Sequence, residues 1–254
     1  MSYSIRSVSR SACGLVKPNN EDSFVLDRII CQPPANVADQ ALSTHSTRAL
    51  QWYAVFDGIG GGPFGEEASF AAAEALLAYG NSVRWMFPNG IRRLINQINK
   101  AVNEVTVGTN GGCTAAIAFV YRRRLVTVHA GDSRIYLFRE KCLTRLTNDH
   151  KSGRLNRHHK ENRHAISRYL GMQTSSEALC TISQAIELHE GDRFLICSDG
   201  LTDMVKDTRI FQRLALHESL EAIADLLLED ALRSGGTDNI TIVIAEVEGK
   251  NQFD

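Results

Sequence analysis

Short runs of β-branched and aromatic residues, each bounded by Gly, Asp, Asn or Arg, recur along the chain and predict strands. Six such runs stand out, at residues 52–56, 114–121, 125–130, 135–138, 193–197 and 240–247. Apolar residues spaced by three and four positions predict helices instead. That spacing runs through residues 66–79, 91–105 and 219–232. Two polar stretches, 32–51 and 148–168, are predicted to be loops.

The order of these elements bears on the fold class. Strands come in consecutive groups separated by helical blocks, without strict alternation of strand and helix, and this order indicates an α+β fold with antiparallel sheets. The chain has 254 residues, of which 43% are hydrophobic, as in an ordinary globular protein. Because the sequence has no internal repeat and no linker rich in Pro, Ser or Gly, we expect residues 1–254 to form a single domain.

Charge and cysteine content exclude several classes of protein. Lys plus Arg (28) nearly cancel Asp plus Glu (29), so no net field favours nucleic acid or an anionic membrane. No apolar run approaches the roughly 18 residues that cross a bilayer, and the N-terminal residues contain no apolar signal region. The six cysteines include no C-x-x-C pair. We therefore expect a cytoplasmic protein that binds neither nucleic acid nor membranes.

Carboxylates recur where a predicted strand meets a turn. They are Asp57, Asp132, Asp199 and Asp238, together with the acidic pair Glu21 and Asp22. Any one of them alone is most simply a turn residue. If the strand ends lie on one side of a stack of sheets, however, the carboxylates converge and require cations at neutral pH. Oxygen ligands without a nearby cysteine favour Mg²⁺ or Mn²⁺.

Two other kinds of site fit the sequence less well. Residues 60–65 contain G-x-G-x-x-G between a strand and a helix, as in dinucleotide-binding proteins, but the acidic residue expected about 20 positions later is missing. These glycines are predicted instead to let the backbone approach metal-bound water and to expose the Gly58 carbonyl. A zinc site at His158, His159 and His164 would lack cysteine partners and helical spacing, so a solvated basic loop is predicted there.

Six motifs stand in a fixed order along the chain: residues 14–22 (GLVKPNNED), 55–61 (VFDGIGG), 65–69 (GEEAS), 130–134 (AGDSR), 197–203 (CSDGLTD) and 235–241 (GGTDNIT). Together they resemble the protein phosphatase 2C family, the metal-dependent serine/threonine phosphatases, in its bacterial form. The resemblance extends from residue 14 to about residue 247. It implies a central β-sandwich of two antiparallel sheets flanked by helices on both faces, in four α-β-β-α layers.

The resemblance also implies a set of metal ligands for two Mn²⁺ or Mg²⁺ ions. Asp57 would bridge the two ions, the Gly58 carbonyl would bind one of them, and Asp199 and Asp238 would bind the other. Two such ions, roughly 3.5 to 4 Å apart, lower the pKa of a bridging water and hold a hydroxide in line with the phosphoryl group. The implied reaction is hydrolysis of phosphoserine and phosphothreonine in proteins, with no covalent intermediate.

Further residues match the family with less definite roles. Glu21 and Asp22 match an acidic pair that acts through direct or water-mediated contacts. Asp132, with Asp199, matches a third and loosely held metal site of bacterial members, but a turn that caps the next strand fits Asp132 equally well. Because the sequence has no C-x-x-x-x-x-R loop, Cys13 and Cys197, which lie near motif residues, are predicted to be ordinary buried thiols and not nucleophiles.

Three features depart from the family pattern. Lys17 stands where an Arg usually binds phosphate, so we predict a phosphate contact for Lys17, with a solvent-facing lysine as the alternative. Ile59 replaces a histidine proposed as general acid in eukaryotic members, which leaves water to supply the proton. The segment between His150 and Leu170 is shorter than the usual flap beside the active site. Its basic side chains are predicted to guide acidic phosphopeptides: Arg154, Arg157, Lys160 and Arg163.

The function predicted on these grounds is that of a protein-serine/threonine phosphatase. Its partners would be a phosphorylated protein and an opposing serine/threonine kinase, and the enzyme is expected to be a monomer. Lys17 and the unusual flap motivate an alternative, a catalytically silent relative that binds phosphoproteins. The presence of every metal-binding carboxylate favours the enzyme.

Overall fold

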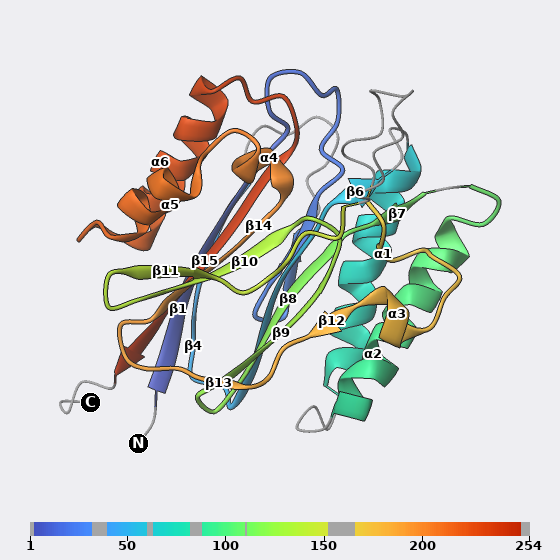
Figure 1. Ribbon diagram of the computed structural model, residues 1–254, viewed down its shortest axis with the longest axis horizontal. Helices are drawn as coiled ribbons and strands as arrows, with labels where there is room; N and C mark the ends of the chain where they lie inside the picture. The colour runs from blue at the N-terminus through green and yellow to red at the C-terminus, as the bar shows by residue number, and fades with distance from the viewer. Residues whose placement is uncertain are drawn as a thin grey trace.

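A computed structural model describes residues 3–31, 40–59, 63–81, 88–109, 111–151 and 166–249. Two β-sheets pack face to face, and helices cover the outer face of each (Figure 1). The first sheet has the order β11-β10-β14-β15-β1-β4, and the second has the order β12-β9-β8-β5-β2-β3 with β13 also paired to β9. Every strand pair in both sheets is antiparallel.

The first sheet contains β1 (Tyr3–Ala12), β4 (Gln40–Ser46), β10 (Arg134–Arg139), β11 (Cys142–Arg145), β14 (Arg193–Cys197) and β15 (Ile240–Gly249). The second contains β2 (Ser23–Leu26), β3 (Ile29–Cys31), β5 (Leu50–Phe56), β8 (Ala115–Tyr121), β9 (Arg124–Ala130), β12 (Thr181–Ile182) and β13 (Ile186–Glu187). A small separate pair is formed by β6 (Gly58–Ile59) and β7 (Gly112–Cys113). The helices are α1 (Pro63–Gly80), α2 (Pro88–Val105), α3 (Ser176–Leu179), α4 (Asp199–Thr202), α5 (Asp207–Leu214) and α6 (Leu220–Arg233).

The alternation of side chains along each strand explains the layers. In β5, Trp52 and Phe56 pack with α1 and α2, whereas Tyr53 and Val55 face the other sheet. In β15, alternate residues pack either against α6 or between the sheets. Both sheets therefore bury apolar side chains on two faces, which produces three apolar layers and four structural layers. The fold class predicted from the sequence is confirmed.

The predicted helices are present with nearly the expected bounds. In α2 one apolar stripe is buried against the second sheet: Ile91, Leu94, Ile95, Ile98 and Val102. Helix α6 begins after Ser219, whose side chain accepts a hydrogen bond from the Ala222 amide at 3.2 Å. It ends before Gly235 and Gly236, both of which have positive φ. The serine cap and the glycine pair, both visible in the sequence, thus define the two ends of α6.

Three strands of the first sheet, β1, β4 and β11, were not predicted, and the loop expected at 32–51 is wrong from Gln40 onward, where β4 begins. Strand β1 pairs with both β15 and β4. Several of its buried positions carry serines, and two of these have hydroxyl partners across the sheet: Ser7 Oγ lies 2.7 Å from Thr44 Oγ1, and Ser11 Oγ lies 2.7 Å from Thr241 Oγ1. Buried serines hide the alternation on which the prediction depended.

Several sequence-based predictions fall outside the described residues. These include the histidines and basic side chains between 152 and 165 and the glycines at 60–62. At the ends of the predicted loop at 148–168, Lys151 and Ile166 form an isolated β-bridge. No helix within the described part of the chain is both long enough and apolar enough to cross a membrane.

Candidate metal centre

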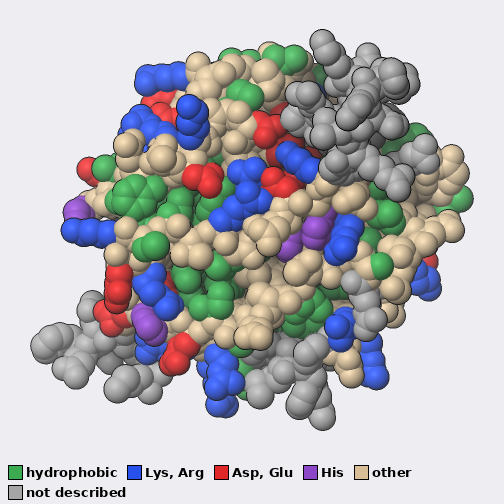
Figure 2. All heavy atoms as spheres, viewed as in Figure 1, with side chains coloured by type: hydrophobic (Ala, Val, Ile, Leu, Met, Phe, Trp, Pro, Cys, Tyr) green, Lys and Arg blue, Asp and Glu red, His purple; other side chains and the backbone are tan. Residues whose placement is uncertain are grey.

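The carboxylates singled out in the sequence come from both sheets and meet at one end of the sandwich. Asp57 follows β5 and Asp132 follows β9 in the second sheet, while Asp199 follows β14 and Asp238 precedes β15 in the first. The acidic pair at 21–22 precedes β2, which runs antiparallel to β5 and so begins at the same end. Figure 2 shows acidic side chains next to Lys and Arg side chains in the region where Figure 1 draws α4 and β6.

Repulsion between these carboxylates is visible in their pKa values. Burial raises the pKa of Asp57 well above its ordinary value, and the charges of Asp22, Asp199, Asp132 and Asp238 raise it further. Burial also raises the pKa of Asp199 to about 7, with the charges of neighbouring aspartates adding to the effect. The fold therefore concentrates negative charge at one point, as the sequence predicted.

Asp22 is fully buried and connects the two sheets. Ser198 donates a hydrogen bond from Oγ to Asp22 Oδ2 at 2.9 Å, and the Thr241 amide donates to Ser198 Oγ at 2.9 Å. Burial raises the pKa of Asp22 to about 6, although hydrogen bonds from Thr241 and Ser198 act in the opposite direction. Within the described residues, Asp22 Oδ1 is buried without a hydrogen-bond partner. This oxygen is open to a water or a metal ion.

Asn239 fastens the loop that carries Glu21 to the start of β15. Its Oδ1 accepts a hydrogen bond from the Glu21 amide at 2.9 Å, and its Nδ2 donates to the carbonyl oxygens of Cys13 and Asn19 at 3.0 and 2.8 Å. Gly14 has φ +79°, and a Cβ there would lie 2.3 Å from the Asp238 carbonyl oxygen. Only glycine permits this approach, so the loop and the start of β15 form one unit.

Glu21 and Gly58 lie at the junction of β6 and α1. A Cβ on Gly65 would lie 2.9 Å from Glu21 Oε2, and a Cβ on Gly58 would lie 2.4 Å from the Gly65 carbonyl oxygen. The absence of side chains at Gly58 and Gly65 thus lets three backbone segments meet beside the Glu21 carboxylate. The predicted use of the Gly58 carbonyl as a metal ligand stays a prediction.

Lys17 forms an ion pair with Asp238, a predicted metal ligand. Its Nζ is 2.8 Å from Asp238 Oδ1, and both side chains are partly exposed. Burial by itself lowers the pKa of Lys17, but the hydrogen bond and charge of Asp238 outweigh burial, so the pKa is raised overall. Lys17 is therefore charged and directed to the carboxylate cluster, and its proposed contact with phosphate stays a prediction.

Comparison with known proteins gives the family. A sequence model described as protein phosphatase 2C matches residues 36–234. The chain belongs to the protein phosphatase 2C family. Serine/threonine protein phosphatase PstP of Mycobacterium tuberculosis is 33% identical over 261 residues, which cover 96% of this chain and 45% of PstP. This chain therefore spans about half the length of PstP.

One further relative and one solved structure match this phosphatase 2C chain along most of their length. Serine/threonine phosphatase stp of Listeria monocytogenes is 30% identical over 216 residues, covering 76% of this chain and 82% of stp. The crystal structure of the catalytic domain of PstP in complex with 2 manganese ions superposes with a TM-score of 0.76 at 31% identity. That superposition covers 98% of this chain and 100% of the PstP domain, so the four-layer fold is shared throughout.

The donor set of this phosphatase 2C chain suits hydrated Mg²⁺ or Mn²⁺. Across the residues that the structure describes, no three Asp, Glu, His or Cys side chains are grouped to enclose an ion by themselves. Mg²⁺ usually keeps several waters and takes only one or two carboxylates, and Mn²⁺ also favours oxygen ligands. Within the described residues, the unpartnered buried Oδ1 of Asp22, together with the burial and charge repulsion that raise the pKa of Asp57, fits carboxylates that face hydrated cations.

The cysteines support chemistry without a thiol nucleophile. Cys197 is buried next to Ser198 and Asp199, and burial raises its pKa to about 12. Burial also raises the pKa of Cys13, which is only partly buried, contrary to the prediction. Both thiols are therefore protonated at neutral pH and poor nucleophiles.

Sequence reasoning missed the partner of Asp132. Lys151 Nζ lies 3.2 Å from Asp132 Oδ2, although the sequence placed Lys151 in a solvated basic loop. In the sequence, Lys151 directly follows Asp149 and His150, and this position alone does not indicate a contact with Asp132. The roles of Ser198 and Asn239 were also missed, because each acts through contacts with residues far away in the chain.

Proposed function

We propose that this chain is a metal-dependent phosphatase that hydrolyses phosphoserine and phosphothreonine in proteins. The observation that carries the proposal is the convergence of carboxylates from both sheets: burial raises the pKa of Asp57 well above its ordinary value, and the charges of the neighbouring aspartates raise it further. Such a site is stable at neutral pH only with cations. The name of PstP and the manganese ions bound to its catalytic domain support the same activity.

Asp57, Asp199, Asp238 and the Gly58 carbonyl would hold two Mn²⁺ or Mg²⁺ ions. When bound, these ions supply a hydroxide at neutral pH and neutralise charge on the phosphoryl group. Glu21 lies beside the junction of β6 and α1, where its carboxylate can accept hydrogen bonds from metal-bound waters.

The chain's own residues then orient these ligands and the substrate. Ser198 fixes the orientation of Asp22 by its hydrogen bond to Oδ2, and Oδ1, which has no partner within the described residues, would accept a hydrogen bond from a metal-bound water. Lys17 Nζ lies 2.8 Å from Asp238 Oδ1; with a cation held by Asp238, the Lys17 ammonium would be free to bind a phosphoryl oxygen. Ile59 offers no proton, so the leaving serine or threonine oxygen takes its proton from water.

The substrate would be a phosphorylated protein of the cytoplasm, with a serine/threonine kinase acting in opposition. We further propose that residues 1–254 act as one domain and as a monomer. The Lys17–Asp238 contact also favours a second candidate, a phosphoprotein-binding module that turns over slowly or not at all, since the ammonium lies on a carboxylate that a metal ion needs.

The test is hydrolysis of p-nitrophenyl phosphate and of a phosphothreonine peptide by the purified chain with Mn²⁺, followed by EDTA and readdition of Mn²⁺. Asp57→Asn should remove most of kcat while its circular dichroism spectrum stays unchanged. Asp225→Asn, which alters a carboxylate on α6 that pairs with Arg10, is the matched control and should keep full activity. Full activity in folded Asp57→Asn would refute the proposal, and peptide binding without turnover would support the second candidate.

A further inference from the structure

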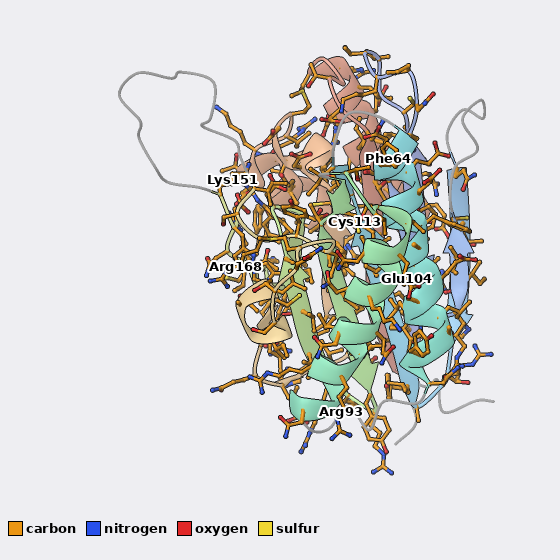
Figure 3. All side chains as sticks on the ribbon, turned by 90° about the vertical axis from the view of Figure 1, so that its right-hand side faces the viewer. Phe64, Arg93, Glu104, Cys113, Lys151 and Arg168 are labelled. Atoms are coloured by element: carbon orange, nitrogen blue, oxygen red, sulfur yellow. The ribbon has the colours of Figure 1, made fainter. Side chains whose placement is uncertain are left out.

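A second lysine–aspartate pair lies on the other side of the carboxylate cluster. Lys151 Nζ is 3.2 Å from Asp132 Oδ2, and the two side chains are 24% and 4% exposed, respectively. Figure 3 shows Lys151 and Arg168 at one edge of the molecule, away from Arg93 and Glu104 on α2. Because Asp132 is buried, its carboxylate depends on a nearby cation to remain ionised.

The backbone around Lys151 is fastened directly to the turn that carries Asp132. The His150 amide donates to the Gly131 carbonyl oxygen at 2.9 Å, and the Gly131 amide donates to His150 Nδ1 at 3.2 Å. The His150 ring is stacked on His129, with ring centroids 4.5 Å apart. The segment before Lys151 is therefore held against Gly131 by both its backbone and its side chain.

The two residues before Lys151 make further contacts. Arg134 donates to both oxygens of Asp149, at 3.1 and 2.8 Å, and Arg145 also pairs with Asp149. The Ser167 amide donates to the His150 carbonyl oxygen at 2.7 Å. Lys151 thus reaches Asp132 from a backbone that is anchored at the two residues before it and that forms a β-bridge with Ile166.

The charges agree with this geometry. Burial by itself lowers the pKa of Lys151, but the charge and hydrogen bond of Asp132 outweigh burial, so the lysine stays protonated. Asp132 is in turn one of the charges that raise the pKa of Asp199. The ammonium therefore supplies positive charge where Asp132 and Asp199 repel each other. A divalent ion bound to Asp132 would lie close to the Lys151 ammonium. Positive charges so close together repel each other.

We propose that Lys151 is a built-in counter-cation for Asp132 that takes the place of a third metal ion. This chain therefore binds two Mn²⁺ ions and no third ion at Asp132. The proposal rests on the function proposed above, because it concerns the same carboxylate cluster. Lys151 acts as a positioning residue: it holds Asp132, and through Asp132 the charge around Asp199, without contacting the substrate.

The test counts bound Mn²⁺ in the full chain, by isothermal titration calorimetry and by electron paramagnetic resonance of the free ion, up to about millimolar Mn²⁺. The wild type should bind two ions and Lys151→Met should bind a third. Lys151→Arg, which keeps a cation, should bind two. Lys100→Met is the matched control, since Lys100 is exposed on α2 and pairs with Glu104, and it should also bind two.

A double variant ties the third ion to one carboxylate. Asp132→Asn combined with Lys151→Met should bind two ions again, because the freed ligand is gone. Three ions in the wild type, or two in folded Lys151→Met, would overturn the proposal and leave the phosphatase function intact. Should Lys151→Met fail to fold, Lys151→Gln is the replacement and the wild-type count still decides. A wild type that binds no Mn²⁺ at all would overturn the proposed function and this inference together.

Discussion

The two lysine–aspartate pairs beside the carboxylate cluster have similar lengths and different surroundings. In one pair, Lys17 and Asp238 are 2.8 Å apart and their side chains are 37% and 41% exposed. In the other, Lys151 and Asp132 are 3.2 Å apart at 24% and 4% exposure. The shorter pair is the weaker one, because water screens an exposed ion pair to roughly 0–1 kcal/mol. Removing one partner of a buried pair instead leaves a charge without solvation.

This difference explains how two similar contacts can have opposite uses. Asp238 lies where its lysine can be exchanged for a metal ion at little cost, since both groups are hydrated. Asp132 is buried, so loss of the Lys151 ammonium would leave its charge without a partner. Lys151 therefore remains paired with Asp132. Burial, and not distance, separates an exchangeable partner from a permanent one.

The largest expected effect is a difference in activity between variants of the two aspartates. Asp238→Asn should lower kcat/KM by about 100- to 1,000-fold, because it removes charge from a metal ligand whose ion stabilises the transition state. Asp132→Asn should lower kcat/KM by less than about tenfold, because its partner is Lys151 and not a metal ion. Steady-state kinetics at saturating Mn²⁺ measures both values. Equal losses in the two variants would contradict the division into exchangeable and permanent pairs.

The second prediction concerns the exchangeable lysine. Lys17→Ala should lower kcat/KM by roughly 10- to 100-fold, the scale of one lost charge-assisted contact of about 1.5 to 3 kcal/mol. Lys17→Arg should keep activity, because arginine also binds phosphoryl oxygens. Calorimetry should show Mn²⁺ binding a few-fold more tightly in Lys17→Ala, since the ammonium no longer competes for Asp238. An unchanged kcat/KM would remove Lys17 from phosphate binding.

The third prediction compares stability in the absence of metal. Lys151→Met should lower the free energy of unfolding by about 2 kcal/mol, because Asp132 is left buried and unpaired. Lys17→Met should lower it by less than about 0.5 kcal/mol, because its pair is solvent-exposed. Urea unfolding in EDTA, followed by circular dichroism, gives both values. Equal destabilisation by the two substitutions would show that burial does not distinguish the pairs.

The smallest expected effect is a pH dependence of thermal stability. The folded chain holds the pKa of Asp199 at about 7, above its ordinary value of 3.8. The folded state therefore keeps a proton that the unfolded state releases, and this contribution to stability is lost as pH rises from about 4 through about 7. In EDTA we expect Tm of the wild type to fall by a few degrees relative to Asp199→Asn between pH 5 and 8.

Bound Mn²⁺ should flatten this decline, because the ion compensates the charge that the proton neutralised. The two lysines should also differ in this measurement. In EDTA, Lys151→Met should steepen the decline of Tm with pH more than Lys17→Met does. Asp132 repels Asp199 directly, and without Lys151 that repulsion is uncompensated. Parallel curves for wild type and Asp199→Asn would show that Asp199 does not titrate in this range.

Much of the fold was predictable because its evidence is local. Residues 52–56 and 193–197 alternate or cluster apolar side chains over a few positions, and both became strands with nearly the expected bounds. The capped stripe of α6 was equally visible. Strand β1 was not, because Ser7 and Ser11 are buried through hydroxyl partners on neighbouring strands. A buried serine cannot be told from an exposed one until its partner is known.

The same division holds at the site. The sequence by itself determined that carboxylates end or begin the strands around Asp57, Asp199 and Asp238, since each aspartate adjoins its own strand in the chain. Only the tertiary structure decided which cation faces which carboxylate. Asp132 precedes β10 and Lys151 follows β11, so they meet because the β10–β11 hairpin returns the chain to its starting point. Charge pairing depends on the distance between side chains in space, and the order of residues along the chain does not give that distance.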